Sequence, residues 1–164
     1  KEEVIDCGYD VDDRGKRCDE ILQMMKRLWT EPASEFHGEF YALAPCRMDP
    51  KPVQKPHIPI IVGGHSSAGF RRAAKYGNGW YGFQMDLEAT AQVTLTLDAA
   101  LANEGRNRDD SLSVITPPYQ VTTDMVKGYE DLGVDQLIVH LGSQKAQRIS
   151  ARLVELESLI EAAA

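Results

Sequence analysis

The segment from Ile58 to Phe83 constrains the fold of this chain more than any other part of the sequence. It opens with the apolar run Ile58–Val62, in which β-branched residues predominate, and this composition predicts a short buried strand. Gly63 and Gly64 follow at once. Two successive glycines allow a sharp turn and leave the backbone N–H groups uncovered by side chains.

A helix and a second strand complete this segment. Ser66 and Ser67 are good N-cap residues, so we expect a helix over Ala68–Tyr76. Glycines end that helix, and Trp80–Phe83 has the composition of the next strand. A strand, a glycine turn, a helix and a strand in this order predict a parallel βαβ unit, with the glycines at the carboxyl end of its first strand.

The turn after the first strand is a candidate anion site. Bare amides and a helix N-terminus meet there, and this combination most often binds a phosphate. The chain has neither a GxGxxG fingerprint nor a Walker loop, so a tight βα turn without a ligand is an equally open interpretation. The missing fingerprint also disfavours a doubly wound dinucleotide-binding domain.

The rest of the chain continues the alternation of strands and helices. A leading helix is expected over Arg14–Trp29, capped by Asp12 or Asp13, and residues 31–57 form a long αβ connection with a small hairpin at Phe36–Tyr41. Beyond the βαβ segment the sequence predicts three helices and two strands, over Glu88–Glu104, Leu112–Thr116, Thr123–Leu132, Gln136–Leu141 and Gln144–Glu161. Four parallel βα units follow, and by composition alone they fit either half of a barrel or a small doubly wound sheet.

Composition excludes several classes of partner. The 164 residues are 43% hydrophobic and 26% charged, which is typical of a globular domain. The net charge of −7 argues against nucleic acid and against a membrane surface as partners. Cys7, Cys18 and Cys46 form no CxxC pair and no Cys/His metal pattern, so we expect reduced thiols, a cytoplasmic location and no metal.

Several runs of sequence, in a fixed order, resemble one enzyme family. The string PHIPIIVGGHS at 56–66 and the string RRAAKYGNGWYGF at 71–83 resemble the luciferase-like flavin and deazaflavin oxidoreductases, whose members share P-P-I-x-V-G-G-x-S and then A-A-x-x-(A/G)-D-G-W. Asn78 stands where the family usually has Asp. The upstream runs RGKRCDEILQMMKRLW, FHGEFYAL and PKPVQKPHIPI match in kind and order.

The resemblance implies an α/β fold, the C-terminal half of a (β/α)8 TIM barrel, with residues 1–164 as a single partial domain. It implies hydride transfer with the deazaflavin coenzyme F420, or an FMN-dependent two-component monooxygenase as the alternative. In the family, the glycine turn and the end of the following strand hold the cofactor phosphate. Carried onto this sequence, the cofactor-binding residues are Gly63, Gly64, His65, Ser66, Tyr81 and Gly82.

The catalytic residues are less clearly marked. His140 is the one candidate, because it follows a strand run and so lies where barrel enzymes place their chemistry. A buried, hydrogen-bonded structural histidine is an equally open interpretation. His37 and His57 fall in the αβ connection, which lies on the opposite face of a barrel, and we expect them to be structural.

Half a barrel exposes two strand edges and one apolar sheet face. We therefore expect this chain to pair with a missing N-terminal half or with a second copy, and to act on a small-molecule substrate. The opening residues suggest a piece of a longer protein. A hypothesis of another class stays open, namely a non-catalytic half-barrel assembly module.

Overall fold

The computed structural model describes residues 2–8, 10–118, 120–142 and 145–163. The chain divides into two compact units, residues 1–60 and residues 61–164, and each is described by itself. Within the described residues, no helix is long and apolar enough to cross a membrane. Whether residues 1–164 behave as one partial domain stays a prediction.

The first unit holds two helices and a hairpin. Helix α1 covers Glu2–Asp6 and was not predicted, whereas α2 covers Arg14–Thr30 and confirms the leading helix. Strands β1, Ser34–His37, and β2, Ala42–Cys46, pair antiparallel, so the predicted hairpin is confirmed and is longer at both ends. Asp13 occupies the N-cap of α2 as expected, but its side chain makes no capping hydrogen bond.

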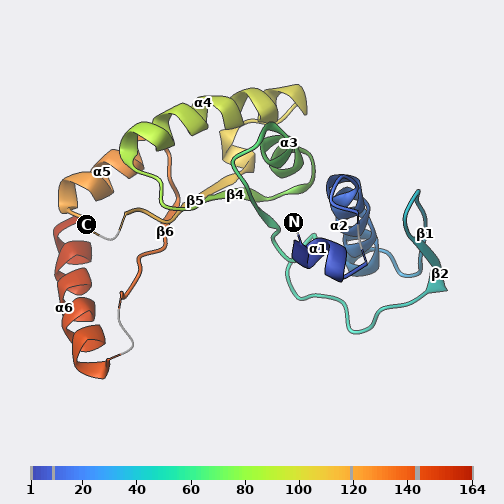
Figure 1. Cartoon of the computed structure of the whole chain (residues 1–164), viewed down its shortest axis with the longest axis horizontal. Helices are drawn as coiled ribbons and strands as arrows, with labels where there is room; N and C mark the ends of the chain where they lie inside the picture. Colours follow the sequence, from blue (N-terminus) through green and yellow to red (C-terminus); the bar gives the residue numbers. More distant parts are fainter. Residues whose placement is uncertain (1, 9, 119, 143–144, 164) are drawn as a thin grey trace. The chain divides into compact units, whose positions relative to one another are not determined.

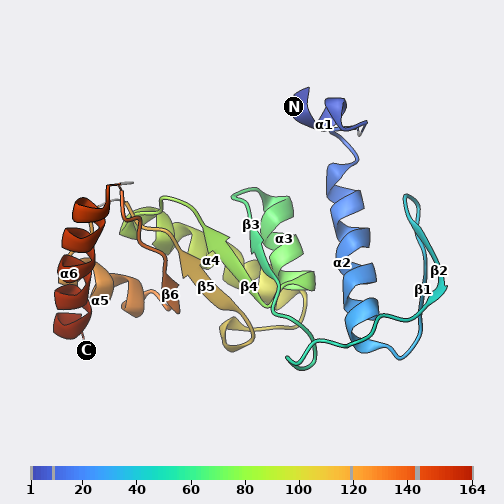
Figure 2. The same ribbon diagram turned by 90° about the horizontal axis from the view of Figure 1, so that it is seen from below.

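The second unit is built on a four-stranded parallel sheet. Its strands are β3, Ile61–Gly63, β4, Gly79–Gly82, β5, Leu112–Ile115, and β6, Gln136–Leu137, and they neighbour one another in this order. In the register, Gly63 lies beside Tyr81. The four predicted parallel βα units are therefore confirmed, and their carboxyl ends lie along one edge of the sheet (Figures 1 and 2).

Each strand leads into a helix of the kind that the sequence predicts. The helices are α3, Ser67–Tyr76, α4, Leu87–Asn103, α5, Thr123–Asp131, and α6, Ala146–Ala163, with a short 3-10 turn η1 at Arg108–Asp110. Ser66, Asp86 and Thr122 cap α3, α4 and α5 through their side-chain oxygens. Figure 1 shows α3 and α4 running along one side of the strands. Gln144, the predicted start of the last helix, lies outside the described residues.

The last strand is shorter than the sequence predicts. We expected it over Gln136–Leu141, but only Gln136 and Leu137 pair with β5, so that prediction was wrong in length. Ile138 still donates its N–H to the Ile115 carbonyl. The pairing ends there because Pro117 and Pro118 follow the neighbouring strand, and proline lacks the N–H that a ladder needs.

The two faces of this sheet differ in burial. One face packs against the helices, because Trp80 lies 5.4 Å from Phe70 of α3 between ring centroids and is only 1% exposed. The other face, called the open face below, carries every second residue of the strands. It includes Ile61, Gly63, Gly79, Tyr81, Leu112 and Val114. Ile61 and Leu112 there are 38% and 45% exposed whereas Val114 is 6% exposed, so this apolar face is accessible at the start of β3 and β5.

Tyr129 of α5 ties the helix layer to the loop after β4. Its hydroxyl is buried and donates to the Met85 carbonyl at 2.7 Å. Burial, and then the nearby Asp86 carboxylate, raise the pKa of Tyr129 above its ordinary value of 10.0. The folded state therefore holds this proton more tightly than the unfolded state does.

The Tyr129 contact predicts a pH-dependent stability. Tyr129→Phe leaves the Met85 carbonyl without this donor and should lower the free energy of unfolding by about 1 kcal/mol. In the parent chain, the stabilisation is fully present below about pH 10 and is lost as the pH rises through the higher pKa of the folded state. Between pH 8 and 11 the melting temperature should therefore fall less steeply with pH in Tyr129→Phe than in the parent. Tyr76→Phe is the control, and its melting temperature should fall as that of the parent does. Equal slopes in all three would contradict the assignment.

Candidate functional site

The carboxyl ends of β3 and β4 bring the predicted cofactor-binding residues together. Gly63 ends β3, Gly64 to Ser66 form the turn into α3, and Tyr81 and Gly82 end β4. Gly63 and Tyr81 are register partners on the open face. The structure thus gathers all six residues at one edge of the sheet, as the βαβ pattern predicts, although their role toward a cofactor stays a prediction.

Gly64 shapes the turn. Its φ of +116° lies in the region that side chains disfavour, and its carbonyl accepts the indole N–H of Trp80 at 2.9 Å. Helix α3 begins close behind it, because a Cβ at Gly69 would come within 2.9 Å of the Gly64 carbonyl oxygen. The turn is therefore fixed by a buried side chain of β4 and by close packing of α3.

Ser66 and Gly82 are explained by the fold itself. The Ser66 hydroxyl accepts the Gly69 N–H at 3.2 Å and so caps α3. A Cβ at Gly82 would overlap the Trp80 ring and the Ile115 side chain at 2.6 and 2.8 Å. Packing alone therefore requires a glycine at position 82.

Gly63 is different, because none of the described residues lies close enough to require a glycine there. Its φ lies outside the left-handed range, and an added Cβ would meet only the Tyr81 ring, at 3.8 Å. The space over this backbone is open, which fits the close approach of a phosphate to bare amides. The start of α3 adds N–H groups that no intrahelical carbonyl accepts.

Two polar contacts cross between the strands at this edge. The Tyr81 hydroxyl lies 2.6 Å from the Thr116 hydroxyl, just beyond β5. The exposed His65 ring stands edge-on to Trp80 at 5.5 Å, and its Nε2 accepts the Phe83 N–H at 3.4 Å. With Nε2 as the acceptor, a neutral His65 carries its proton on Nδ1, so its other nitrogen is a donor.

His140 lies at the same edge, and the residues that the structure describes around it form no catalytic constellation. It is exposed, and its ring stands nearly perpendicular to that of Phe83, with 6.2 Å between centroids. The interpretation of His140 as a buried structural residue was therefore wrong. The sequence placed Phe83 at the end of its strand but gave it no role in the site, although strict alternation after Tyr81 puts it on the open face.

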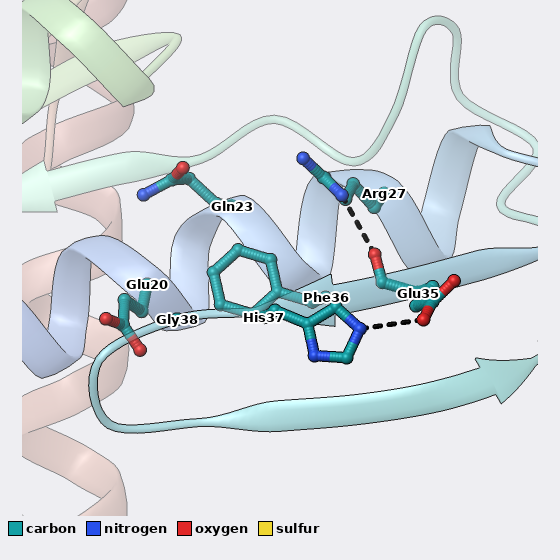
Figure 3. Close-up of a pocket in the computed structure, with 7 residues that line it drawn as sticks. All are labelled: Glu20, Gln23, Arg27, Glu35, Phe36, His37 and Gly38. Carbon is teal, nitrogen blue, oxygen red and sulfur yellow. Dashed lines mark hydrogen bonds and ion pairs between the residues drawn. The ribbon is translucent and has the colours of Figure 1, made fainter.

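A hollow of about 470 Å³ lies within residues 1–60 (Figure 3). Several of its polar groups hydrogen-bond to the hairpin. The Glu20 carboxylate accepts the N–H groups of Glu39, Phe40 and Tyr41 at 2.7 to 3.1 Å, and Arg27 donates to the Glu35 carbonyl. These contacts agree with the structural role expected for this connection.

The chain belongs to the luciferase-like monooxygenase family, whose model matches residues 1–152. The resemblance inferred from the sequence is thereby confirmed. An uncharacterized protein of Mycobacterium tuberculosis (strain ATCC 25618 / H37Rv) is 38% identical over 134 residues, 77% of this chain and 42% of that protein. The FMNH(2)-dependent dimethylsulfone monooxygenase of Pseudomonas putida is 37% identical over 70 residues, 43% of this chain and 19% of that enzyme.

A solved structure shows the same fold. An F420-dependent secondary alcohol dehydrogenase, in complex with an F420-acetone adduct, matches with a TM-score of 0.59 at 21% identity, over 76% of this chain and 38% of that chain. The match to part of a longer chain confirms the predicted partial TIM-barrel fold. The chain spans less than half the length of these three proteins.

Proposed function

We propose that this chain forms the phosphate-binding half of an oxidoreductase that transfers hydride with the deazaflavin coenzyme F420. Membership of the luciferase-like family supports an oxidoreductase, and the F420-dependent alcohol dehydrogenase supports the deazaflavin. When bound, the cofactor supplies the hydride chemistry, and the protein binds and orients it.

The observation that carries this proposal is the open space over Gly63. At Gly64 and Gly82, backbone conformation and packing account for the glycine, but at Gly63 neither does. A ligand that approaches the bare backbone supplies the missing reason. The phosphate would then accept N–H groups of the β3–α3 turn, with the His65 Nδ1 proton as a further donor.

The other residues of this edge have supporting roles in the proposal. Tyr81, fixed by Thr116, would line the wall beside the phosphate. His140, exposed at the end of β6, is the candidate for holding or moving a proton of the substrate. The substrate itself would be a small molecule that enters from the carboxyl edge of the sheet.

An FMN-dependent monooxygenase is the alternative, and the similarity to the dimethylsulfone monooxygenase favours it. FMN and F420 both carry a phosphate on a ribityl arm, so the same turn would serve either. Oxygen separates them, because a reduced deazaflavin reacts poorly with it. Rapid oxygen consumption by the reduced holoenzyme would support the monooxygenase, and slow consumption would support hydride transfer.

Gly63→Ala tests the phosphate site in the complete polypeptide that contains this sequence. The methyl group fits the protein, so the melting temperature should hold or rise slightly. It would displace the phosphate from one charge-assisted hydrogen bond, which is worth about 1.5 to 3 kcal/mol. Fluorescence titration should therefore show F420 or FMN binding weakened roughly tenfold to a hundredfold.

Gly105→Ala is the matched control. Gly105 has a φ of +68° and lies just after α4, so alanine there is strained but remote from the turn. This variant should melt at a lower temperature and bind the cofactor as the parent does. If Gly63→Ala binds as tightly as the parent, the turn is not the phosphate site. If the parent itself binds neither cofactor, the non-catalytic assembly module becomes the better interpretation.

A further inference from the structure

Phe83 is an exposed aromatic residue in a fixed position. Its side chain is 50% exposed at the carboxyl end of β4, and it is the only aromatic among the large exposed apolar residues of the described chain. A single exposed apolar residue is common on protein surfaces, so the case for Phe83 depends on how its loop is held and on what lies beside it.

The backbone around Phe83 is anchored on both sides. The Phe83 N–H donates to His65, and the buried Met85 donates its N–H to the Thr116 carbonyl at 3.0 Å. Between them, Gln84 has a φ of +51°, a conformation that side chains seldom adopt. Strained residues of this kind cluster at functional sites. The exposure of Phe83 is thus a property of an ordered loop.

His140 contacts the Phe83 ring from the β6 side of the sheet. The two rings are 6.2 Å apart and nearly perpendicular, at 87°. An edge-to-face arrangement is a favoured geometry for aromatic pairs, and it holds one ring face available. Phe83 follows β4 directly and His140 lies three residues beyond β6, so together they bridge the sheet edge over β5.

Phe83 and His140 lie along the same sheet edge as the phosphate turn, in the direction in which a bound cofactor would extend. Neighbouring strands lie about 4.8 Å apart, so the edge from β3 to β6 spans roughly 14 Å. A phosphate at the β3–α3 turn starts a ribityl arm that carries a flat conjugated ring. An arm that extends along this edge brings the ring over β4 to β6.

We infer that Phe83, supported by His140, forms an aromatic wall that receives the conjugated ring of the flavin-type cofactor. This inference rests on the proposed function. Phe83 contacts the ring and contributes to its binding. His140 acts through Phe83 as a positioning residue, which differs from the proton-handling role considered above.

The test compares cofactors with and without the phosphate in the complete polypeptide. FMN is paired with riboflavin, and F420 with the phosphate-free 8-hydroxy-5-deazariboflavin, each followed by fluorescence titration. Phe83→Ala should weaken both members of a pair by roughly tenfold, because the lost contact is to the ring. Leu95→Ala is the control, since Leu95 is 73% exposed on α4 and should leave all affinities unchanged. Unchanged affinities in Phe83→Ala, with a parent-like melting temperature, would overturn the inference.

The same titrations separate this inference from the proposed phosphate site. Gly63→Ala should weaken FMN or F420 and spare their phosphate-free partners, whereas Phe83→Ala should weaken both. If only the Gly63→Ala pattern is not observed, the phosphate site is wrong and the aromatic wall stands. If only the Phe83→Ala pattern is not observed, the aromatic wall is wrong and the phosphate site stands.

His140 variants test the positioning role. His140→Ala should weaken ring binding two- to threefold, and His140→Phe should restore it, because phenylalanine can keep the edge contact. Restored ring binding in His140→Phe supports positioning, because phenylalanine keeps an edge contact but has no nitrogen that could hold a proton. If binding in His140→Phe is as weak as in His140→Ala, the support of Phe83 by His140 is wrong.

Discussion

Replacing Trp80 with alanine is expected to lower the free energy of unfolding by about 3 to 5 kcal/mol. Trp80 is 1% exposed and packs against Phe70 of α3 on the helix-side face of the sheet. Its indole N–H also donates to the Gly64 carbonyl. The truncation therefore both opens a cavity and removes the hydrogen bond that fixes the turn. Urea unfolding followed by circular dichroism measures the loss.

Trp80→Phe separates these two effects. Phenylalanine keeps much of the apolar volume but removes the N–H, so the hydrogen-bond part should cost about 1 kcal/mol. It should also weaken cofactor binding, because the Gly64 turn loses the side chain that fixes it. Trp29→Phe, in α2 of the other unit, is the matched control and should leave the affinity unchanged. A loss below about 1 kcal/mol in Trp80→Ala would show that Trp80 does not organise this part of the core.

Local signals were sufficient to predict the order of the strands and α-helices from α2 onward. Ser66 caps α3, and Gly105 and Gly133 follow α4 and α5 with positive φ, as residues at these positions should. Such signals act within a few residues, so they survive in the sequence. The family resemblance then chose a half-barrel over a doubly wound sheet, a choice that composition left open.

The features that the sequence did not predict depend on distant partners. The length of β6 was overestimated because it is set by where β5 ends. The hairpin turn of the first unit is fixed by Glu20, which lies about 20 residues upstream, and no local pattern marks that contact. Phe83 was placed at a strand end but given no role, because its exposure is visible only once the sheet is formed.

The candidate site shows the same division between local and tertiary information. The sequence placed six residues at one edge, but only the packing around each glycine distinguishes them. Gly82 is required by Trp80 and Ile115, whereas Gly63 is not required by any neighbour. The ligand hypothesis therefore now rests chiefly on Gly63.

The open face predicts how the 164-residue chain behaves by itself. Ile61, Leu112 and Ile138 are 38%, 45% and 43% exposed, and Gly79 lies between the first two without a side chain of its own. Strands β3 and β6 end the sheet on either side. An accessible apolar sheet face with two free edges favours association. We propose that another piece of sheet covers it, either from the rest of a longer polypeptide or from a second copy.

In sedimentation velocity at micromolar concentration, the isolated chain should therefore form dimers or larger species. Leu112→Lys places a charge on the open face, at the start of β5, and should shift the population toward monomer at least several-fold, because burying an unpaired ammonium group is unfavourable. Leu95→Lys adds the same charge to an apolar residue that is 73% exposed on α4, and it should leave the association unchanged. A stable monomer in the parent chain would contradict the proposal. Equal shifts in the two lysine variants would show that net charge controls the association, since a cover over the open face predicts a shift in Leu112→Lys alone.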